Sequence, residues 1–279
     1  MVKLPLSKRI LVHAGILVGC IVMIYPLLWM FVSSFKPEIE IFRDPSLIPR
    51  MVTLQNYFVG WNAFQVPFGR FFLNSIIIVA FACTGTVITC SMAAYAFARL
   101  RFVLRKPLFA IMLATLMLPF HVTVIPQYII FNELGWINTF LPLIVPAALG
   151  LHAFFIFLIV QFIRAIPREL DQQAEIDGCG PIRTYMYLIM PLSVPALMTA
   201  VILQFIWRWN DFFQQLLYLA DMRLYTVTLA LRQFVDAMGR SHWGPLFAMS
   251  VLSLLPMFIV FIFFQKYLIE GIVTGGVKG

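Results

Sequence analysis

The sequence alternates between long apolar segments and shorter polar ones. A helix needs about 20 apolar residues to cross the hydrocarbon core of a bilayer. Each crossing segment must be helical, because an open chain cannot leave its backbone groups unpaired in lipid. We therefore predict an all-α membrane protein that forms one domain over residues 1–279. Its six transmembrane helices are predicted at about residues 10–33, 71–98, 107–130, 140–163, 185–207 and 245–268.

Several predicted spans contain proline, which kinks a helix by removing one backbone hydrogen bond. Neighbouring helices can satisfy the carbonyl groups that a kink frees. The prolines are therefore consistent with ordinary packing geometry and also with a bundle that has to bend. The residues concerned are Pro119, Pro126, Pro146, Pro191, Pro195 and Pro256.

Lysine and arginine predict the orientation of the spans. With six spans, both chain ends lie on the same side. The segments on that side carry twelve basic residues, and the other side carries eight, nearly all in long loops at 34–70 and 208–244. Short loops weigh most in the positive-inside rule, and the short loop from Arg99 to Lys106 is strongly basic. We therefore place this loop and both chain ends in the cytoplasm. The basic N-terminus precedes an apolar run that lacks a small-residue cleavage site, so we interpret the run as a retained first span.

Composition supports a membrane protein and excludes several other classes. The chain is 62% apolar and only 11% charged, whereas soluble domains are about 45–50% apolar and about 25% charged. Its net charge of +8 does not indicate nucleic-acid binding, because no basic run with interleaved aromatic residues occurs. The four cysteines show neither a CxxC motif nor a Cys/His cluster, so no disulfide framework or zinc site is predicted.

The stretch 167-PRELDQQAEIDGCG-180 contains four of the twelve acidic residues and lies between the fourth and fifth predicted spans, on the cytoplasmic side. Pro167 suits a first helical position, and Gly178 is a stop signal, so we predict a short helix over 167–177. Ile166, Leu170 and Ala174 form an apolar stripe, with Arg168, Asp171, Gln172 and Glu175 on the other side. The pattern favours a docking helix over a solvated loop, and a catalytic or metal-binding carboxylate cluster is the weakest alternative.

The motifs of this chain resemble those of the permease subunits of bacterial ATP-binding-cassette importers. I-P-R-E-L-D-Q-Q-A-E-I-D-G at 166–178 is similar to their cytoplasmic EAA loop. Further motifs resemble the carbohydrate-importer branch, the maltose-permease-like subunits. They are A-Y-A-F-A-R-L-R-F at 94–102, M-L-P-F-H-V-T-V-I-P-Q-Y at 117–128, L-G-W-I-N-T at 134–139, W-N-D-F at 209–212 and the C-terminal F-Q-K-Y-L-I-E-G-I-V-T-G-G-V-K-G.

The resemblance implies a six-helix type I importer permease in a bacterial inner membrane, whose short helix couples to an ATPase subunit. Implied partners are a second homologous permease, an ATPase dimer that binds ATP and Mg²⁺, an extracytoplasmic solute-binding protein and the lipid bilayer. The chain itself would hold no cofactor and catalyse nothing. The coupling residues are Glu169, Leu170, Asp171, Gln172, Gln173, Ala174, Ile176, Asp177 and Gly178. This chain has Gln172-Gln173-Ala174 where the family pattern has Glu-Ala-Ala.

Two further surfaces follow from the same resemblance. The C-terminal tail would contact the ATPase dimer through Gly275, Gly276 and Lys278. The loop 208–244 would face the binding protein, with Asp211, Asp221, Arg223, Arg232 and Asp236 as its charged residues.

Polar side chains inside the spans are candidates for the translocation path, since they are costly in lipid. We name Thr84, His121, Gln127 and Gln204, although a threonine can also bond back to its own helix. The main alternatives are an intramembrane enzyme and an ion-coupled carrier, but no span has an acidic residue at its centre. No phosphate-binding G-x-x-x-x-G-K-[ST] motif occurs, so ATP hydrolysis must come from a partner. The sequence does not decide whether the cargo is a neutral sugar, a uronide fragment or a polyol phosphate.

Overall fold

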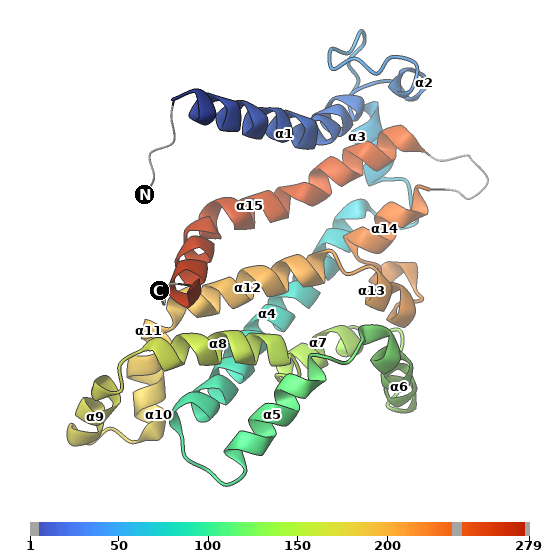
Figure 1. Ribbon diagram of the computed structural model, residues 1–279. Coiled ribbons are helices and arrows are strands. Elements are labelled where there is room, and N and C mark those ends of the chain that lie inside the picture. The colour runs from blue at the N-terminus through green and yellow to red at the C-terminus, as the bar shows by residue number, and fades with distance from the viewer. Residues whose placement is uncertain (1–5, 236–241, 277–279) are drawn as a thin grey trace. The chain divides into compact units, whose positions relative to one another are not determined.

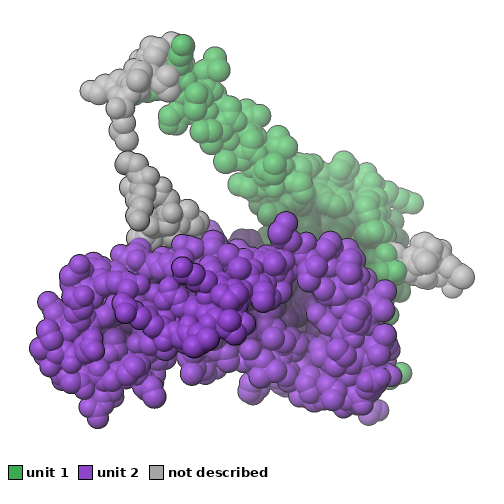
Figure 2. Space-filling view, turned by 60° about the horizontal axis from the view of Figure 1, so that its bottom comes forward, with its two compact units in different colours: residues 1–69, 230–255 green, residues 70–229, 256–279 purple. Residues whose placement is uncertain are grey.

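A computed structural model describes residues 6–235 and 242–276. The regular elements within these residues are all helical (Figure 1). The all-α fold class predicted from the apolar segments is therefore confirmed. The chain forms two compact units, shown in green and purple in Figure 2. Unit 1 comprises residues 1–69 and 230–255, and unit 2 comprises residues 70–229 and 256–279.

Unit 1 contains the first predicted span and the loop that follows it. Its helices are α1 (Leu6–Ser33), α2 (Glu38–Ile41), α3 (Gln55–Trp61) and the first part of α15 (Trp243–Gly276). Trp29 packs against Phe42 and Phe247, with ring centroids 6.1 and 5.4 Å apart. The Nζ atom of buried Lys36 donates hydrogen bonds of 2.6 Å to the carbonyl oxygens of Asp44 and Ser46. The loop after the first span thus has a packed structure of its own.

Unit 2 contains most of the remaining helices. In chain order they are α4 (Phe68–Arg99, which begins in unit 1), α5 (Arg105–Thr115), α6 (Phe120–Glu133), α7 (Leu141–Ala148), α8 (Ala153–Ala165), α9 (Glu169–Ile176), α10 (Pro181–Thr184), a π-helical turn (Tyr185–Ile189), α11 (Met190–Leu192), α12 (Val194–Trp209), α13 (Phe213–Tyr218), a 3₁₀ turn (Met222–Leu224) and α14 (Val227–Gln233, which ends in unit 1).

Four helical segments of the described chain are long and apolar enough to cross a membrane, and two bent pairs bring the number to as many as six. The four are Lys8–Ser33, Phe68–Arg99, Leu141–Ala165 and Trp243–Tyr267. The apolar window of Lys8–Ser33 is 0% buried within the chain, so its side chains need lipid or another subunit to cover them.

The third and fifth predicted spans are bent pairs of helices and not continuous helices. Helices α5 and α6 meet at 102°, and the segment Pro181–Leu192 meets α12 at 73°. Pro119 lies at the first break in an extended conformation, and Pro191 and Pro195 flank the second break at Ser193. Proline has no backbone N–H, so Pro119 and Pro195 cannot continue the helical hydrogen bonding across these breaks. The prolines therefore bend the bundle sharply in both places.

The core of unit 2 joins α4, α8, α12 and the π-helical turn. Figure 1 shows α8 and α12 side by side, and the buried core residues from these elements include Ala94, Phe155, Ile159, Tyr185 and Leu197. Small residues let helices approach closely. At Gly85 of α4, an added Cβ would lie only 2.4 Å from the Cα of Ala148, so α4 and the end of α7 are in backbone contact there.

Candidate functional site

Helix α9 is the short helix that the acidic stretch predicts, but it begins two residues later than predicted. It spans Glu169–Ile176, and Pro167 lies before it and not at its first position. Ile166 is extended, as expected for a residue that precedes proline. The first helical hydrogen bonds run from the backbone N–H groups of Asp171 and Gln172 to the carbonyl of Arg168, over 3.0 and 3.2 Å.

The exit of α9 is a Schellman motif built on Gly178. The Cys179 N–H donates to the Ala174 carbonyl over 2.8 Å, and the Gly178 N–H donates to the Glu175 carbonyl over 3.0 Å. Gly178 has φ of +77°, a region that is strained for residues with a Cβ atom. The sharp glycine exit predicted from the sequence is therefore present.

The end of α4 holds the loop that carries α9 in place at its entry and at its exit. The Nε atom of Arg99 lies 3.0 Å from Oδ2 of Asp171, and its Nη2 donates to the Ile166 carbonyl over 2.7 Å. One turn earlier, the hydroxyl group of Tyr95 donates to the Pro181 carbonyl over 3.0 Å. Because these contacts reach the entry, the first turn and the exit of the loop, α9 is fixed to α4 at several points.

This attachment corrects the orientation that the sequence predicted for Asp171. The side chains of Arg99 and Asp171 are only 6% and 24% exposed, so Asp171 is directed toward Arg99 of its own chain. Leu170 and Ala174 are also half-buried, whereas Ile176 is 84% exposed. The remaining predicted coupling residues are exposed: Glu169, Gln172, Gln173, Asp177 and Gly178.

A hollow of about 510 Å³ lies beside α9. Its charged lining has three arginines against two acids, namely Arg99, Arg101, Arg168, Asp171 and Glu175. Gln172, one of the two positions at which this chain differs from the Glu-Ala-Ala pattern, also lines it. The hollow between α9 and the end of α4 therefore carries both signs of charge, and the exposed Ile176 does not line it.

A second polar site lies at the end of α12, where a cavity of about 270 Å³ opens. It is lined by Phe120, His152, Gln204, Trp207, Arg208, Asp211 and Gln214. These residues come from the start of α6, the entry to α8, the last turns of α12 and the segment that leads into α13. The cavity thus brings together parts of three predicted spans.

Arg208 and Asp211 form an ion pair in this cavity. Nη1 of Arg208 lies 3.0 Å from Oδ2 of Asp211 and also donates to Oε1 of Gln214. The two charged side chains are 7% and 15% exposed. Burial raises the pKa of Asp211, and the positive charge of Arg208 acts in the opposite direction. Asp211, which the sequence assigned to the binding-protein-facing surface, thus has a side chain that is mostly buried against Arg208.

Two polar groups of the cavity have no hydrogen-bond partner among the described residues. They are Nε2 of Gln204 and Nε2 of His152, and both atoms are buried. Gln204 as a whole residue is only 1% exposed. Buried polar groups in native proteins are nearly always hydrogen-bonded, so these two require an explanation.

Only one of the four predicted translocation residues lines this cavity, namely Gln204. Thr84 and His121 are exposed, and Gln127 is half-buried. His121 contacts the ring of Phe213 at 6.0 Å. Sequence reasoning missed Phe120, His152, Trp207, Arg208 and Gln214. An arginine at the end of an apolar run was a usable signal, but the fifth span was predicted to end at residue 207 and Arg208 was assigned to a loop.

None of the other described residues predicted for these surfaces lines either cavity. Asp221, Arg223 and Arg232 are exposed, and Asp221 accepts a hydrogen bond of 2.8 Å from the Arg223 backbone. Asp236 lies outside the described residues. At the C-terminus, α15 continues through Gly275 and Gly276, beyond the predicted end of the sixth span, and Lys278 lies outside the described residues.

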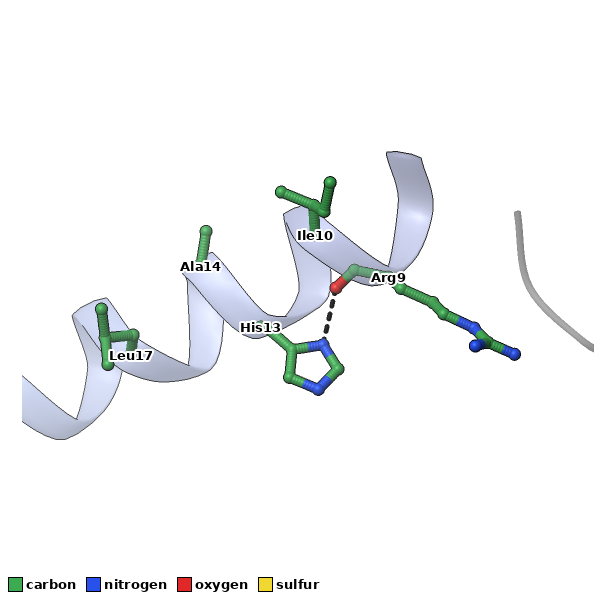
Figure 3. A pocket seen from close by; sticks show the side chains of 5 residues that line it. All are labelled: Arg9, Ile10, His13, Ala14 and Leu17. Carbon is green, nitrogen blue, oxygen red and sulfur yellow. Dashed lines mark hydrogen bonds between the residues drawn. The ribbon is translucent and has the colours of Figure 1, made fainter. Parts of the chain in front are cut away.

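A third hollow, on α1, is lined by Arg9, Ile10, His13, Ala14 and Leu17 (Figure 3). All five residues belong to one helix, and Nδ1 of His13 bonds only locally, to the Arg9 carbonyl over 2.7 Å. A groove along a single helix does not enclose a ligand. Within the described residues, no three His, Cys, Asp or Glu side chains come together as metal ligands would.

Comparison with known proteins identifies the family. Residues 85–273 match the family described as "Binding-protein-dependent transport system inner membrane component". The chain is 36% identical over 255 residues to the probable ABC transporter permease protein YurM of Bacillus subtilis, covering 91% of this chain and 84% of that protein. It is 33% identical over 272 residues to the trehalose/maltose transport system permease protein MalG of Thermococcus litoralis, covering 98% of each.

The fold matches a chain in the crystal structure of a bacterial ABC transporter involved in the import of the acidic polysaccharide alginate. The TM-score is 0.83 with 21% sequence identity, over 96% of this chain and 99% of that chain. The chain therefore belongs to the binding-protein-dependent transport system inner membrane components. It is a multi-pass membrane permease of an ABC importer, a non-catalytic subunit that assembles with others into a transporter.

Proposed function

We propose that this chain is one of two homologous permease subunits in an ATP-driven importer of sugars or oligosaccharides. Helix α9 docks into a groove of an ATPase subunit, and ATP-driven movement of the ATPases rocks the bundle between inward-open and outward-open states. ATP and Mg²⁺ are bound by those partners. An extracytoplasmic binding protein delivers the cargo on the opposite side of the membrane. There it docks on the loop that contains Asp221, Arg223 and Arg232.

The observation that carries this proposal is that α9 is attached to its own chain on one side and exposed on the other. One side of the helix is fastened to α4 through Asp171 and Arg99, at 3.0 Å. The other side is open and includes Ile176, which is 84% exposed. A helix that is rigidly attached to a membrane span and open on its far side can transmit a push from a soluble partner to that span.

The distribution of basic residues indicates on which side of the membrane α9 lies. The loop from Arg99 to Lys106 is the most basic short loop of the chain, so the positive-inside rule places it in the cytoplasm of a bacterial inner membrane. Arg99 also binds Asp171, so α9 lies on the same side. Both chain ends then lie in the cytoplasm, and Gly275, Gly276 and Lys278 are available to contact the ATPase dimer.

The cargo class rests on the relatives. The MalG protein of Thermococcus litoralis is named for trehalose and maltose transport, and the structurally similar chain belongs to an importer of alginate. Both cargoes are saccharides, one neutral and one acidic. A saccharide is therefore the cargo that we propose for this chain.

The test of docking is Ile176→Asp in the assembled transporter. Removing an exposed apolar side chain has little effect on folding, but a charge placed in the docking surface should release the ATPase. We expect the permease to purify with much less ATPase, and uptake of the cargo to fall in parallel. Ile48→Asp is the matched control, because Ile48 is 82% exposed and lies in the loop proposed to be on the other side of the membrane.

Two outcomes would contradict the proposal. If Ile176→Asp retains the full amount of ATPase and normal uptake, α9 is not the docking helix. If Ile48→Asp loses the ATPase and Ile176→Asp does not, the proposed orientation is reversed.

A further inference from the structure

We propose that the cavity at the end of α12 is a binding site for one ring of a neutral, hydroxyl-rich saccharide during its passage through the transporter. The inference rests on the proposed function, since it assigns the residues that would contact the cargo of such an importer. It goes further by placing a contact site within this chain and by excluding anionic cargo from it.

The first argument is the unused hydrogen-bonding capacity of the cavity. Nε2 of Gln204 and Nε2 of His152 are buried and have no partner among the described residues. Leaving such groups unpaired costs free energy, and replacement of both by apolar groups would avoid that cost. Their presence is accounted for if a ligand completes their hydrogen bonds. Hydroxyl groups suit both atoms, because a hydroxyl group can donate and accept.

The second argument is the composition of the cavity lining, which combines aromatic and polar side chains. Trp207 and Phe120 line the same cavity as Gln204 and His152. The Trp207 ring is supported by Phe154 and Phe155, with centroid distances of 5.2 and 5.1 Å. A sugar ring has an apolar C–H face and a polar edge, so it requires an aromatic surface beside hydrogen-bonding groups. Ligand sites in general combine aromatic side chains with a few placed polar groups.

The third argument is size. The cavity holds about 270 Å³. Small-molecule sites range from about 300 to 1,000 Å³, and one water molecule occupies about 30 Å³ in the liquid. The cavity is therefore much larger than a single bound water requires and at the lower limit of ligand sites. It suits one sugar ring and not an entire oligosaccharide.

The fourth argument is charge. The charged side chains of the lining are Arg208 and Asp211, which neutralise each other at 3.0 Å. Nη1 of Arg208 is further occupied by Oε1 of Gln214. A carboxylate or phosphate on the ligand would have to displace Asp211 and would leave two negative groups close together. Like charges in a poorly solvated site repel strongly, so the cavity disfavours acidic sugars.

The test uses the complete transporter with its binding protein in proteoliposomes. Uptake of labelled maltose, trehalose and arabinobiose is compared with uptake of digalacturonate, and ATP hydrolysis is measured in the same vesicles. We expect the unmodified transporter to import at least one neutral disaccharide and not digalacturonate. The informative quantity is the number of saccharides imported per ATP hydrolysed.

Gln204→Leu should lower this ratio roughly tenfold, the size expected when one hydrogen bond to a ligand is lost. Trp207→Ala removes the aromatic surface and should also lower the ratio. Gln161→Leu is the matched control, because Gln161 lies on the exposed side of α8 and does not line the cavity. Trp207→Phe keeps an aromatic ring and should retain most of the ratio.

The outcomes separate this inference from the proposed function. If neutral sugars are imported and both variants keep the normal ratio, the cavity holds only water and the inference fails alone. Import of digalacturonate with no neutral sugar leaves a saccharide importer but overturns the assignment of the cavity. If ATP is hydrolysed and no saccharide of either kind is imported, both the proposed function and the inference fail.

Discussion

Two buried arginine–aspartate pairs in unit 2 have the same chemistry and different consequences. In both, an arginine nitrogen lies 3.0 Å from Oδ2 of the aspartate. Arg99 and Asp171 come from α4 and α9, separated in sequence by the third and fourth spans. Arg208 and Asp211 are three residues apart at the end of α12. The first pair fastens two distant elements together, whereas the second is local and neutralises charge beside a cavity.

The surroundings of the two pairs differ as well. Around Arg99, the Ile166 carbonyl and the Tyr95 hydroxyl complete a set of contacts between α4 and the loop that carries α9. Around Arg208, Nε2 of Gln204 and Nε2 of His152 are buried and have no hydrogen-bond partner among the described residues. Nε of Arg99 and Oδ1 of Asp171 are also buried without a hydrogen bond in the described chain, so the two pairs do not differ in that respect. They differ in what they join: the first connects α4 to α9, whereas the second lies beside the cavity that we propose as a binding site.

The largest expected effect comes from Asp171→Ala. Breaking a buried pair leaves an uncompensated charge, so we expect the free energy of unfolding to fall by about 3 kcal/mol. The loop that carries α9 should also detach locally. Trypsin cleavage after exposed Arg168 should therefore become much faster than in the unmodified chain.

Asp211→Ala breaks the other pair and serves as the control for that local effect. It should lower thermal stability without changing the rate of cleavage after Arg168. Equal cleavage rates in the two variants would mean that the Arg99–Asp171 pair does not hold α9.

A smaller effect is expected at the exit of α9, from Gly178→Ser. The substituted side chain meets open space, but φ of +77° imposes a cost of about 1–2 kcal/mol on a residue with a Cβ atom. Gly180→Ser is the matched change two residues later. Gly180 is the N-cap of α10 in an extended conformation, where serine is favoured. Thermal unfolding of the two variants should differ clearly, and equal stabilities would refute the argument from φ.

The smallest effect on stability is expected for Gln204→Leu. Replacing an unpaired buried amide by an apolar side chain of similar size should leave the unfolding temperature unchanged or slightly raised. Gln215→Leu provides the contrast. The Gln215 amide donates to the Arg208 carbonyl over 3.2 Å and accepts from Thr226, so its loss should cost about 2 kcal/mol. Destabilisation of the same size in both variants would show that Gln204 is satisfied in the folded transporter.

Much of the coupling region was predictable because its signals are local. Pro167, the acids and Gly178 indicate a short helix with a sharp exit, and the structure has that helix two residues shorter at its start. The orientation of Asp171 was not predictable. A helical pattern shows which residues share a face, but the arginine that binds Asp171 lies in another span.

Less of the cavity was predictable. Gln204 was recognised as a polar residue within a span, but its neighbours come from three spans whose relative positions depend on packing. Arg208 was assigned to a loop, because an arginine at the end of an apolar run normally indicates the membrane surface. Its partner Asp211 and the neighbouring Phe120 and His152 place it in a buried site instead.

The sequence alone determined that this chain is a helical membrane protein of the importer permease family with a short helix between its fourth and fifth spans. The length of the apolar segments, the basic loops and the turn residues are local features of the chain. They can therefore be recognised in the sequence without knowledge of the tertiary contacts. Only the tertiary structure decided that Asp171 faces α4, and that polar groups without partners among the described residues meet at the end of α12. These features depend on contacts between residues far apart in the chain, and no local pattern contains that information.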